Sequence, residues 1–140
     1  VCSSDLEMPI VFPVHPRTQG RLEAFDLWEK LVSAQGIKLQ GPLGYNDFLA
    51  LSSQAKVIVT DSGGLQEEST ALLIPCLTMR ENTERPITVT EGTSTLCGSD
   101  ADMLRDCLKQ VAAGTYKQGK CPELWDGKAA ERIVEALIST

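Results

Sequence analysis

Residues 56–73 constrain the fold of this chain more than any other segment. The segment starts with an apolar, β-branched stretch, Lys56-Val57-Ile58-Val59-Thr60, which predicts a strand. It turns at Asp61-Ser62-Gly63-Gly64 and continues at once into a helix-favouring segment, residues 65–73. A strand, a glycine turn and a helix in succession place unpaired backbone N–H groups and the positive end of the helix dipole at the turn. We therefore expect an α/β fold with an anion-binding turn.

Two interpretations of this turn remain open. Gly63 and Gly64 let a phosphate approach the backbone closely, and glycine can adopt positive φ without a Cβ penalty. Similar turns also occur where nothing binds. Glu67 and Glu68 are predicted in the first helical turn, where carboxylates interact favourably with the helix dipole. Alternatively, Glu68 accepts hydrogen bonds from ribose hydroxyls, as an acidic residue does in dinucleotide-binding folds.

The rest of the chain alternates short apolar runs with amphipathic segments, which predicts a parallel sheet flanked by helices. Further strands are expected at residues 9–14, 37–39, 75–79 and 94–97, and further helices at 18–34, 45–54 and 127–138, with one more that opens at Ser99 or Asp100. Ligands of such sheets lie beyond the carboxyl ends of the strands. Three polar clusters are predicted at that edge: His15-Pro16-Arg17, Asp61–Gly64 and the charged loop Arg80–Pro86 with Arg85.

The first of these clusters holds the only histidine of the chain. His15 could donate to a phosphate or transfer a proton near neutral pH, or it could simply hydrogen-bond to the backbone beside a proline. Arg17 and Arg21 lie one helical turn apart. They either form a solvated helix face or supply a phosphate ligand, and of the two we favour Arg17 as the ligand.

Two further side chains complete a possible nucleoside-diphosphate site. Arg85 could form a bidentate pair with a diphosphate, or it could make an ion pair within its loop with Glu81 or Glu84. Phe48 could pack on a nucleobase, or it could belong to the core. Phosphate donors, a ribose carboxylate and an aromatic residue are therefore all present, but an acid–base set for chemistry on a sugar is not.

Charge and composition exclude several classes of function. The chain has 140 residues, of which 42% are hydrophobic, as expected for one globular α/β domain. Its net charge is −6 and it has no basic run, which argues against nucleic-acid binding. No apolar run approaches the ~18 residues that a membrane-spanning helix needs, so we expect no membrane association.

The cysteines indicate a reducing environment. The chain has five cysteines without CxxC or Cys/His spacing, which argues against a disulfide framework and a zinc site. Cys76 and Cys97 fall in strand-like runs and are expected to be buried. We therefore predict a cytoplasmic location, with no metal and no cofactor. The chain starts at Val1, and residues 1–7 match no pattern.

Five motifs together resemble the non-hydrolysing UDP-N-acetylglucosamine 2-epimerases. They occur in the expected order over residues 8–138: Phe12-Pro-Val-His-Pro-Arg17, Pro42-Leu-Gly-Tyr-Asn-Asp-Phe48, Thr60-Asp-Ser-Gly-Gly-Leu-Gln-Glu-Glu68, Arg80-Glu-Asn-Thr-Glu-Arg-Pro86 and Trp125-Asp-Gly-Lys-Ala-Ala-Glu-Arg-Ile133. The resemblance implies two Rossmann-like domains in a glycosyltransferase-B arrangement, with the active site between them. This chain resembles the C-terminal, UDP-binding domain only, over residues 8–140. The resemblance also implies a homodimeric parent protein that binds a UDP-sugar.

By motif position, the resemblance also implies roles for individual residues. Ser62, Gly63 and Gly64 would contact the diphosphate, Glu68 the ribose, Arg85 the phosphates and Phe48 the uracil, with His15 as the catalytic residue near the sugar–phosphate link. Members of the family eliminate UDP to form 2-acetamidoglucal and add it back after protonation of the other face of C2. The acidic residues that move this proton lie in the N-terminal domain, which nothing here matches.

The chain departs from the family pattern at two positions. Ile87 replaces a common glutamate after Thr-Glu-Arg-Pro, and Leu73 replaces a common glycine, which predicts an altered helix end. Two alternatives to an epimerase also stay open: a UDP-dependent glycosyltransferase domain of the same architecture, and a regulatory module that binds UDP-sugars without chemistry.

Overall fold

The structure of the protein is a computed structural model that describes residues 8–139. The prediction that residues 1–7 match no pattern therefore concerns residues outside the described part. The chain divides into two compact units, one ending at Ser52 and the other beginning at Ser53. We describe each unit by itself.

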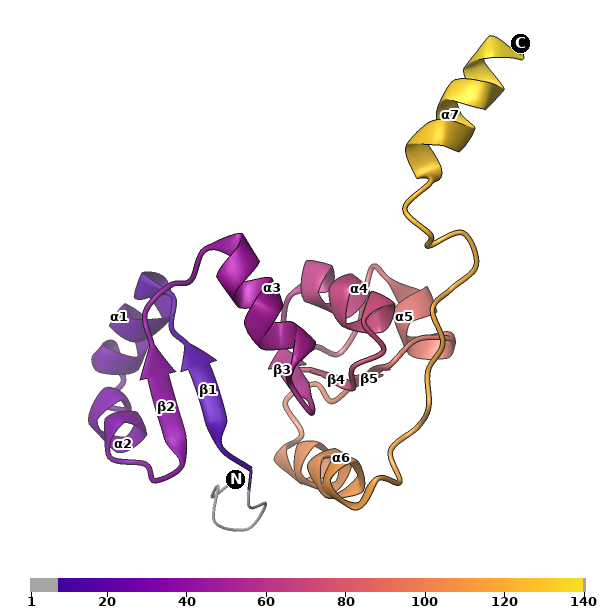
Figure 1. Ribbon diagram of the computed structural model, residues 1–140. Coiled ribbons are helices and arrows are strands. Elements are labelled where there is room, and N and C mark those ends of the chain that lie inside the picture. Colours follow the sequence, from indigo (N-terminus) through magenta and orange to yellow (C-terminus); the bar gives the residue numbers. More distant parts are fainter. Residues whose placement is uncertain (1–7, 140) are drawn as a thin grey trace. The chain divides into compact units, whose positions relative to one another are not determined.

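The first unit is a two-stranded parallel sheet with helices beside it (Figure 1). Strand β1 (Ile10–Pro13) pairs with β2 (Ile37–Gln40). Helices α1 (Pro16–Ala24) and α2 (Trp28–Val32) connect the two strands, and α3 (Tyr45–Ser53) follows β2. The strands expected at residues 9–14 and 37–39 are thereby confirmed, and so is the helix expected at 45–54.

The single helix expected over residues 18–34 is wrong, because the chain breaks it into α1 and α2. At the break, Asp26 adopts a left-handed conformation with φ 54°. Its N–H donates to Glu23 O at 3.1 Å, and Leu27 N–H donates to Leu22 O at 2.8 Å. These two bonds form a Schellman motif, which satisfies the last carbonyls of α1. Aspartate tolerates the left-handed region better than most residues, so it ends a helix that the apolar pattern would continue.

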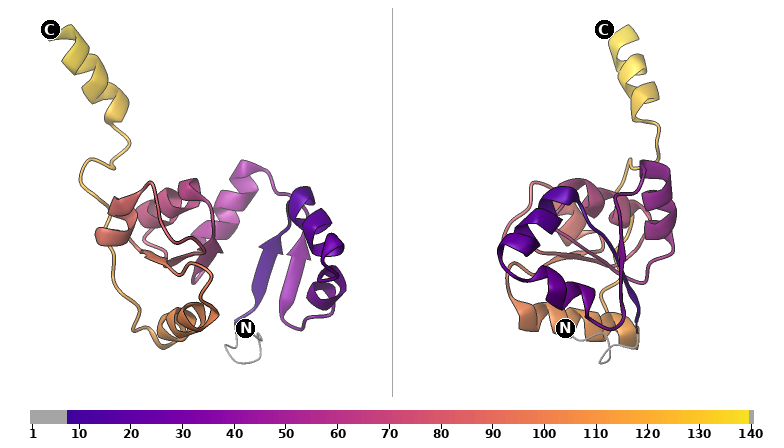
Figure 2. Two further views of the ribbon diagram at one scale, coloured as in Figure 1. Left: turned by 180° about the vertical axis from the view of Figure 1, so that it is seen from behind. Right: turned by 90° about the vertical axis from the view of Figure 1, so that its left-hand side faces the viewer.

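The second unit is built on a three-stranded parallel sheet in the order β3-β4-β5. Its strands are β3 (Ile58–Thr60), β4 (Cys76–Thr78) and β5 (Ser94–Leu96), and its helices are α4 (Gly63–Ala71), α5 (Pro86–Thr90), α6 (Ala101–Ala113) and α7 (Ala129–Ile138). Helices α4 and α5 lie on one face of this sheet and α6 lies on the other (Figures 1 and 2). The predicted fold class, a parallel α/β structure flanked by helices, is confirmed, with the five strands paired in two sheets.

The central strand β4 forms the core of the second unit. Cys76, Leu77 and Thr78 have no exposed surface, and Cys97 after β5 is buried as well. Burial raises the pKa of the Cys97 thiol to about 11, with Cys107 close by. A thiol with so high a pKa stays protonated and unreactive at neutral pH. The expectation that Cys76 and Cys97 are small buried apolar groups is confirmed.

Helix α5 is absent from the elements that the sequence predicts. It has only five residues, and four of them are β-branched, which is unfavourable for a helix. Pro86 occupies its first turn, where the missing N–H costs nothing. Thr88 is completely buried in it, so tertiary packing rather than propensity holds this turn.

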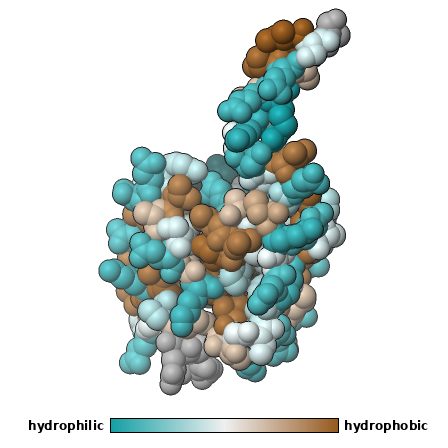
Figure 3. All heavy atoms as spheres, turned by 45° about the vertical axis from the view of Figure 1, so that its right-hand side comes forward, coloured by the Kyte–Doolittle hydropathy of each residue, from teal (hydrophilic) through white to brown (hydrophobic). Residues whose placement is uncertain are grey.

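Helix α7 is amphipathic, and none of its described residues is buried. Its exposed apolar side chains are Ile133, Val134, Leu137 and Ile138 (Figure 3). Between Met8 and Ser139, none of the helices has both the length and the apolar character needed to cross a lipid bilayer.

Candidate functional site

The turn after β3 presents free backbone donors at the start of α4. Ser62 precedes the helix in an extended conformation, and its side chain makes no capping hydrogen bond. The first N–H group of the helix that bonds to a carbonyl is that of Gln66, which donates to Ser62 O at 3.3 Å. Among the described residues, the N–H groups of Gly63, Gly64 and Leu65 therefore have no acceptor. Three free donors at a positive helix end are an arrangement that can bind an anion.

The two glycines leave open space at this helix end. Neither Gly63 nor Gly64 has a positive φ, so the expectation of a left-handed conformation is wrong. A Cβ added at Gly63 would meet nothing within 4 Å, and one at Gly64 would meet only the Ser62 Oγ, at 3.9 Å. Neither backbone strain nor packing within the described residues thus requires glycine here. Close approach of a bound group is the remaining physical reason for glycine at both positions.

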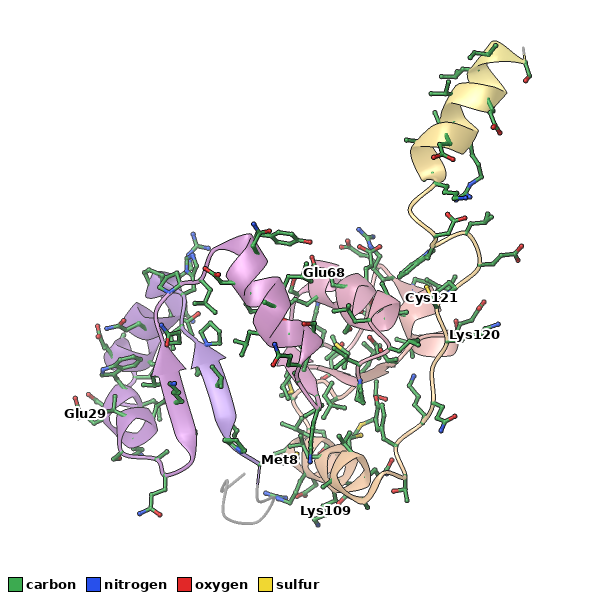
Figure 4. The ribbon with its side chains drawn as sticks, viewed as in Figure 1. Met8, Glu29, Glu68, Lys109, Lys120 and Cys121 are labelled. Atoms are coloured by element: carbon green, nitrogen blue, oxygen red, sulfur yellow. The ribbon has the colours of Figure 1, made fainter. Side chains whose placement is uncertain are left out.

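The helix begins at Gly63, two residues earlier than its apolar pattern indicates. Glu67 and Glu68 consequently lie in the second turn of the helix. The prediction that they lie in the first turn is wrong. In the second turn the dipole interaction is weak, because it falls off within the first turn. Glu68 lies on α4 (Figure 4) and is half-buried. Its carboxylate makes no hydrogen bond or ion pair with the other residues in the range 8–139.

Arg85 is held beside α4 by Glu67. The Arg85 Nε lies 2.8 Å from Glu67 Oε1, and both side chains are a little more than two-fifths exposed. The predicted ion pair of Arg85 with Glu81 or Glu84 is therefore wrong. Arg85 contacts Glu84 through the backbone carbonyl, at 3.4 Å from Arg85 Nη1. The structure therefore joins the loop after β4 to the helix after β3, as the predicted convergence of these two clusters requires.

Gln66 links the same two segments from inside the unit, and the sequence predicts no role for it beyond its place in a motif. It has no exposed surface. Its Oε1 accepts a hydrogen bond from Thr83 Oγ1 at 2.7 Å, and Thr88 Oγ1 lies 3.4 Å away. The sequence shows only a glutamine in a helical segment with little apolar periodicity, and this pattern does not indicate that the side chain is buried.

The two threonines also hold the backbone of Arg85. Thr83 Oγ1 accepts from Arg85 N–H at 2.9 Å, and Thr88 Oγ1 donates to Arg85 O at 2.7 Å. Both polar groups of this peptide segment are thus satisfied by side chains that also face Gln66.

A hollow of about 270 Å³ lies at the carboxyl ends of β4 and β5. Arg80 and Glu81 from the loop after β4 line it together with Gly98, Ser99, Asp100 and Met103. Glu81 Oε1 accepts from Ser99 N–H at 3.3 Å, and a Cβ on Gly98 would come within 2.3 Å of this oxygen. Glu81 is therefore committed to the turn before α6 and not to Arg85.

In the first unit, His15 and Arg17 lie at the start of α1. His15 is the N-cap, and its Nδ1 accepts from Arg17 N–H at 3.2 Å. Since Nδ1 is the acceptor, neutral His15 carries its proton on Nε2, in an exposed ring. The structural interpretation of His15 as a backbone-bonded residue is thus confirmed, and its Nε2–H remains available as a donor.

The other candidates of this unit lie on α1 and α3. The side chain of Arg17 is exposed, whereas Arg21 lies over the ring of Phe25 at 5.6 Å from its centroid. Phe48 is half-buried on α3. Between Met8 and Ser139 there is no cluster of three or more His, Cys, Asp or Glu side chains that could hold a metal ion.

Comparison with known proteins gives consistent matches. The family model described as UDP-N-acetylglucosamine 2-epimerase matches residues 2–138. A UDP-N-acetylglucosamine 2-epimerase of Methanocaldococcus jannaschii is 44% identical over 128 residues, which are 91% of this chain and 34% of that protein. The enzyme of the same name from Methanococcus maripaludis is 46% identical over 109 residues, 78% of this chain and 30% of that protein.

Solved structures give the same result. The crystal structure of Methanocaldococcus jannaschii UDP-GlcNAc 2-epimerase in complex with UDP-GlcNAc and UDP matches with a TM-score of 0.83 and 42% identity. The match covers 99% of this chain and 38% of that chain. The chain therefore spans about a third of the length of the curated relatives it matches. By sequence and by fold, the chain belongs to the UDP-N-acetylglucosamine 2-epimerase family.

Proposed function

We propose that this chain is the UDP-binding part of an enzyme that interconverts UDP-N-acetylglucosamine and UDP-N-acetylmannosamine. The observation that carries the proposal is the start of α4, where three N–H groups have no acceptor among the described residues and two glycines leave open space where a Cβ would be. A diphosphate fits this position because it supplies negative charge and several acceptor oxygens. Family membership and the related enzyme in complex with UDP-GlcNAc and UDP support the same ligand.

Within the second unit, the roles follow from geometry and chemistry. Gly63 and Gly64 bind the diphosphate through their backbone N–H groups, and Ser62 binds it through its hydroxyl, because the Ser62 N–H already donates to Thr60 Oγ1 at 3.0 Å. Arg85 adds a guanidinium, which Glu67 orients. Glu68 accepts from the ribose hydroxyls, a role for which its carboxylate has no competing partner among the described residues.

Within the first unit, motif position assigns the roles. Phe48 packs on the uracil, and Arg17 supplies a further cation to the phosphates. His15 donates through Nε2–H near the bond between sugar and phosphate, because its Nδ1 is engaged in capping α1.

These residues account for one half of the reaction. Elimination breaks the bond between C1 and the β-phosphate oxygen, and negative charge develops on UDP as it leaves. Donors that are already oriented toward the diphosphate stabilise this charge without reorganisation. Removal of the proton at C2, and its return to the other face, falls to acidic residues in the part of the parent protein outside this chain.

We also propose that the parent protein is a cytoplasmic homodimer. The cytoplasmic location is supported by Cys76, Cys97, Cys107 and Cys121, which are all free thiols. Family membership favours the epimerase over the glycosyltransferase alternative. An epimerase assay after this chain is joined to the rest of its parent protein separates an enzyme from a binding module.

Calorimetric titration of the chain with UDP tests the proposal. Arg85→Ala and Glu68→Ala should each weaken binding about tenfold or more, because each removes a hydrogen bond that involves a charged group. Arg105→Ala is the matched control and should leave the affinity unchanged, since among the described residues Arg105 pairs with Asp102 on its own helix α6. Absence of UDP binding by a folded wild-type chain, or equal effects of all three variants, would overturn the proposal.

A further inference from the structure

The strongest feature not explained by direct ligand binding is the buried amide of Gln66. A primary amide with no exposed surface is costly to bury unless it forms hydrogen bonds. Its oxygen accepts from Thr83 Oγ1 at 2.7 Å, whereas its Nε2 is buried and has no partner. An apolar side chain of the same length would avoid this unpaired donor. The amide is therefore better explained by what its oxygen holds than by the packing it provides.

What its oxygen holds is the loop that carries Arg85. The Thr83 hydroxyl has one proton, which it donates to Gln66, and it uses a lone pair to accept from Arg85 N–H at 2.9 Å. Rotation of this hydroxyl is thereby fixed at both ends. The chain of bonds runs from α4 through Gln66 and Thr83 to the backbone of Arg85.

The side chain of Arg85 returns to the same helix. Its Nε lies 2.8 Å from Oε1 of Glu67, the residue that follows Gln66. Two adjacent residues of α4 thus hold Arg85, Gln66 through the backbone and Glu67 through the guanidinium. An ion pair whose side chains are more than two-fifths exposed is weak by itself, so the buried bond must supply most of the positional restraint.

We infer that Gln66 is a positioning residue that fixes Arg85 against α4 through the Thr83 hydroxyl. The consequence of this restraint for the ligand rests on the proposed function, in which Arg85 binds the diphosphate. The restraint itself concerns only this chain, so it is testable without nucleotide. A restrained guanidinium loses less side-chain entropy when it binds a phosphate, which raises affinity without any new contact.

Proton exchange at Arg85 Nε tests the restraint directly. The Nε–H signal of Arg85 in a ¹H–¹⁵N spectrum, identified by its loss in Arg85→Lys, should exchange slowly with water because Glu67 accepts its proton. Gln66→Met and Thr83→Val preserve volume but remove one end of the bond, and each should speed this exchange at least about fivefold, the equivalent of one ordinary hydrogen bond. Thr83→Ser keeps the hydroxyl and should restore slow exchange. Glu67→Met removes the acceptor and sets the upper limit.

The backbone N–H of Met79 is an internal control in the same spectrum, since it donates to Thr60 O at 2.8 Å beside the central strand of the same unit. A general loss of stability would speed exchange at Met79 as well, whereas loss of the Thr83 bond alone would not. Unchanged exchange at Arg85 in both Gln66→Met and Thr83→Val would overturn the inference.

A binding cycle links the restraint to UDP. Thr83→Val should weaken UDP binding about fivefold in the wild-type background and should have no further effect in Arg85→Ala, because Thr83 acts through Arg85. Equal effects in both backgrounds would contradict action through Arg85. Failure of the wild-type chain to bind UDP would count against the proposed function, while the exchange experiment would still decide the positioning role.

Discussion

Gly63 and Gly64 are proposed to serve binding at the expense of stability. Both have ordinary helical backbone conformations, and open space lies where a Cβ would be. Glycine in such a position costs folding entropy that alanine would not cost. The chain therefore carries two glycines that packing among the described residues does not require, and the proposed diphosphate ligand would account for them.

Gly64→Ala should stabilise the chain and weaken its ligand binding. We expect the free energy of unfolding to rise by about 0.4–1 kcal/mol, because the unfolded chain loses freedom while the native φ suits alanine. UDP affinity should fall at least about tenfold, since the added methyl group occupies the approach to the free N–H groups. Urea unfolding and calorimetry measure the two effects, and Gly20→Ala on α1 is a control with equally open space. A destabilised variant, or an unchanged affinity, would contradict this account.

His15 combines a structural and a proposed catalytic role in its two ring nitrogens. His15→Ala should destabilise the chain by about 1 kcal/mol, because α1 loses its side-chain cap. His15→Asn should keep the stability near that of the wild type, since asparagine is an efficient N-cap. If Nε2–H contacts the ligand, both variants should bind UDP-N-acetylglucosamine more weakly. Wild-type affinity in His15→Asn would leave His15 as a helix cap only.

At the level of elements, helix ends determine where the chain changes direction. Helix α4 ends in a Schellman motif, in which Leu73 N–H donates to Thr70 O at 3.1 Å and Ile74 N–H donates to Ser69 O at 2.8 Å. Leu73 occupies the left-handed position with φ 57°. The family resemblance predicted an altered helix end from leucine at a common glycine position. The motif itself is intact, and the substitution appears as backbone strain instead.

Leu73→Gly should relieve this strain. Left-handed backbone costs a non-glycine residue about 1 kcal/mol, and little burial is lost because Leu73 is 55% exposed. We expect the free energy of unfolding to rise by about 0.5–1 kcal/mol. The stability of Leu73→Asn should lie between those of the wild type and Leu73→Gly. Urea unfolding measures the series, and Leu72→Gly, one residue earlier with φ −83°, should destabilise instead.

The start of α7 depends on one carboxylate. Asp126 accepts from Arg132 through both oxygens at 2.9 Å and from Lys128 N–H at 3.0 Å. These bonds, with Arg132 contributing most, lower the pKa of Asp126 from its usual value of 3.8 to about 2. The charged form is therefore the one that the folded chain favours.

Acidification should loosen this helix start in a defined range. The stabilisation from Asp126 is complete above pH 3.8 and is lost as the pH falls through about 2, because the folded chain then has to bind a proton that the unfolded chain has already bound. The carboxyl ¹³C shift of Asp126 should titrate near pH 2, and Asp126→Asn should abolish the pH dependence of α7 amide signals in this range. A titration midpoint near 4 would contradict the Arg132 pairing.

At the level of the whole molecule, the described residues contain groups proposed to bind a nucleotide. They do not contain a complete set of acidic and basic groups for proton transfer at the sugar. The chain spans about a third of the length of its curated relatives. Its proposed site contains phosphate donors and a ribose carboxylate, and Glu67 is occupied by Arg85. Epimerisation also needs proton carriers on both faces of C2.

The 140-residue chain should therefore show no epimerase activity alone, because groups on a separate part of the parent protein have to be held at the reacting carbon. A coupled assay for UDP-N-acetylmannosamine with the purified chain measures this, and the complete parent protein is the positive control. Detectable turnover by the chain, absent in Arg85→Ala, would refute the prediction.

Much of the fold follows from local sequence patterns. The order of strands and helices, the parallel class and the glycine turn after β3 depend on patterns within about ten residues, where hydrophobic period and glycine position act directly. The family motifs add proposed residue roles because they preserve spacing. Helix boundaries were less predictable, since Asp26 ends α1 through backbone conformation and α5 forms despite β-branched residues.

Contacts between distant residues decided the rest. The partner of Arg85 is Glu67 and not a neighbour in its own loop, and Gln66 is buried against Thr83, seventeen positions away. A sequence specifies which side chains can pair, but it does not specify which loop folds back onto which helix. The sequence alone therefore determined the fold class and the position of the glycine turn between β3 and α4. Only the tertiary structure decided how Arg85 is held there, because that depends on packing between segments far apart in the chain.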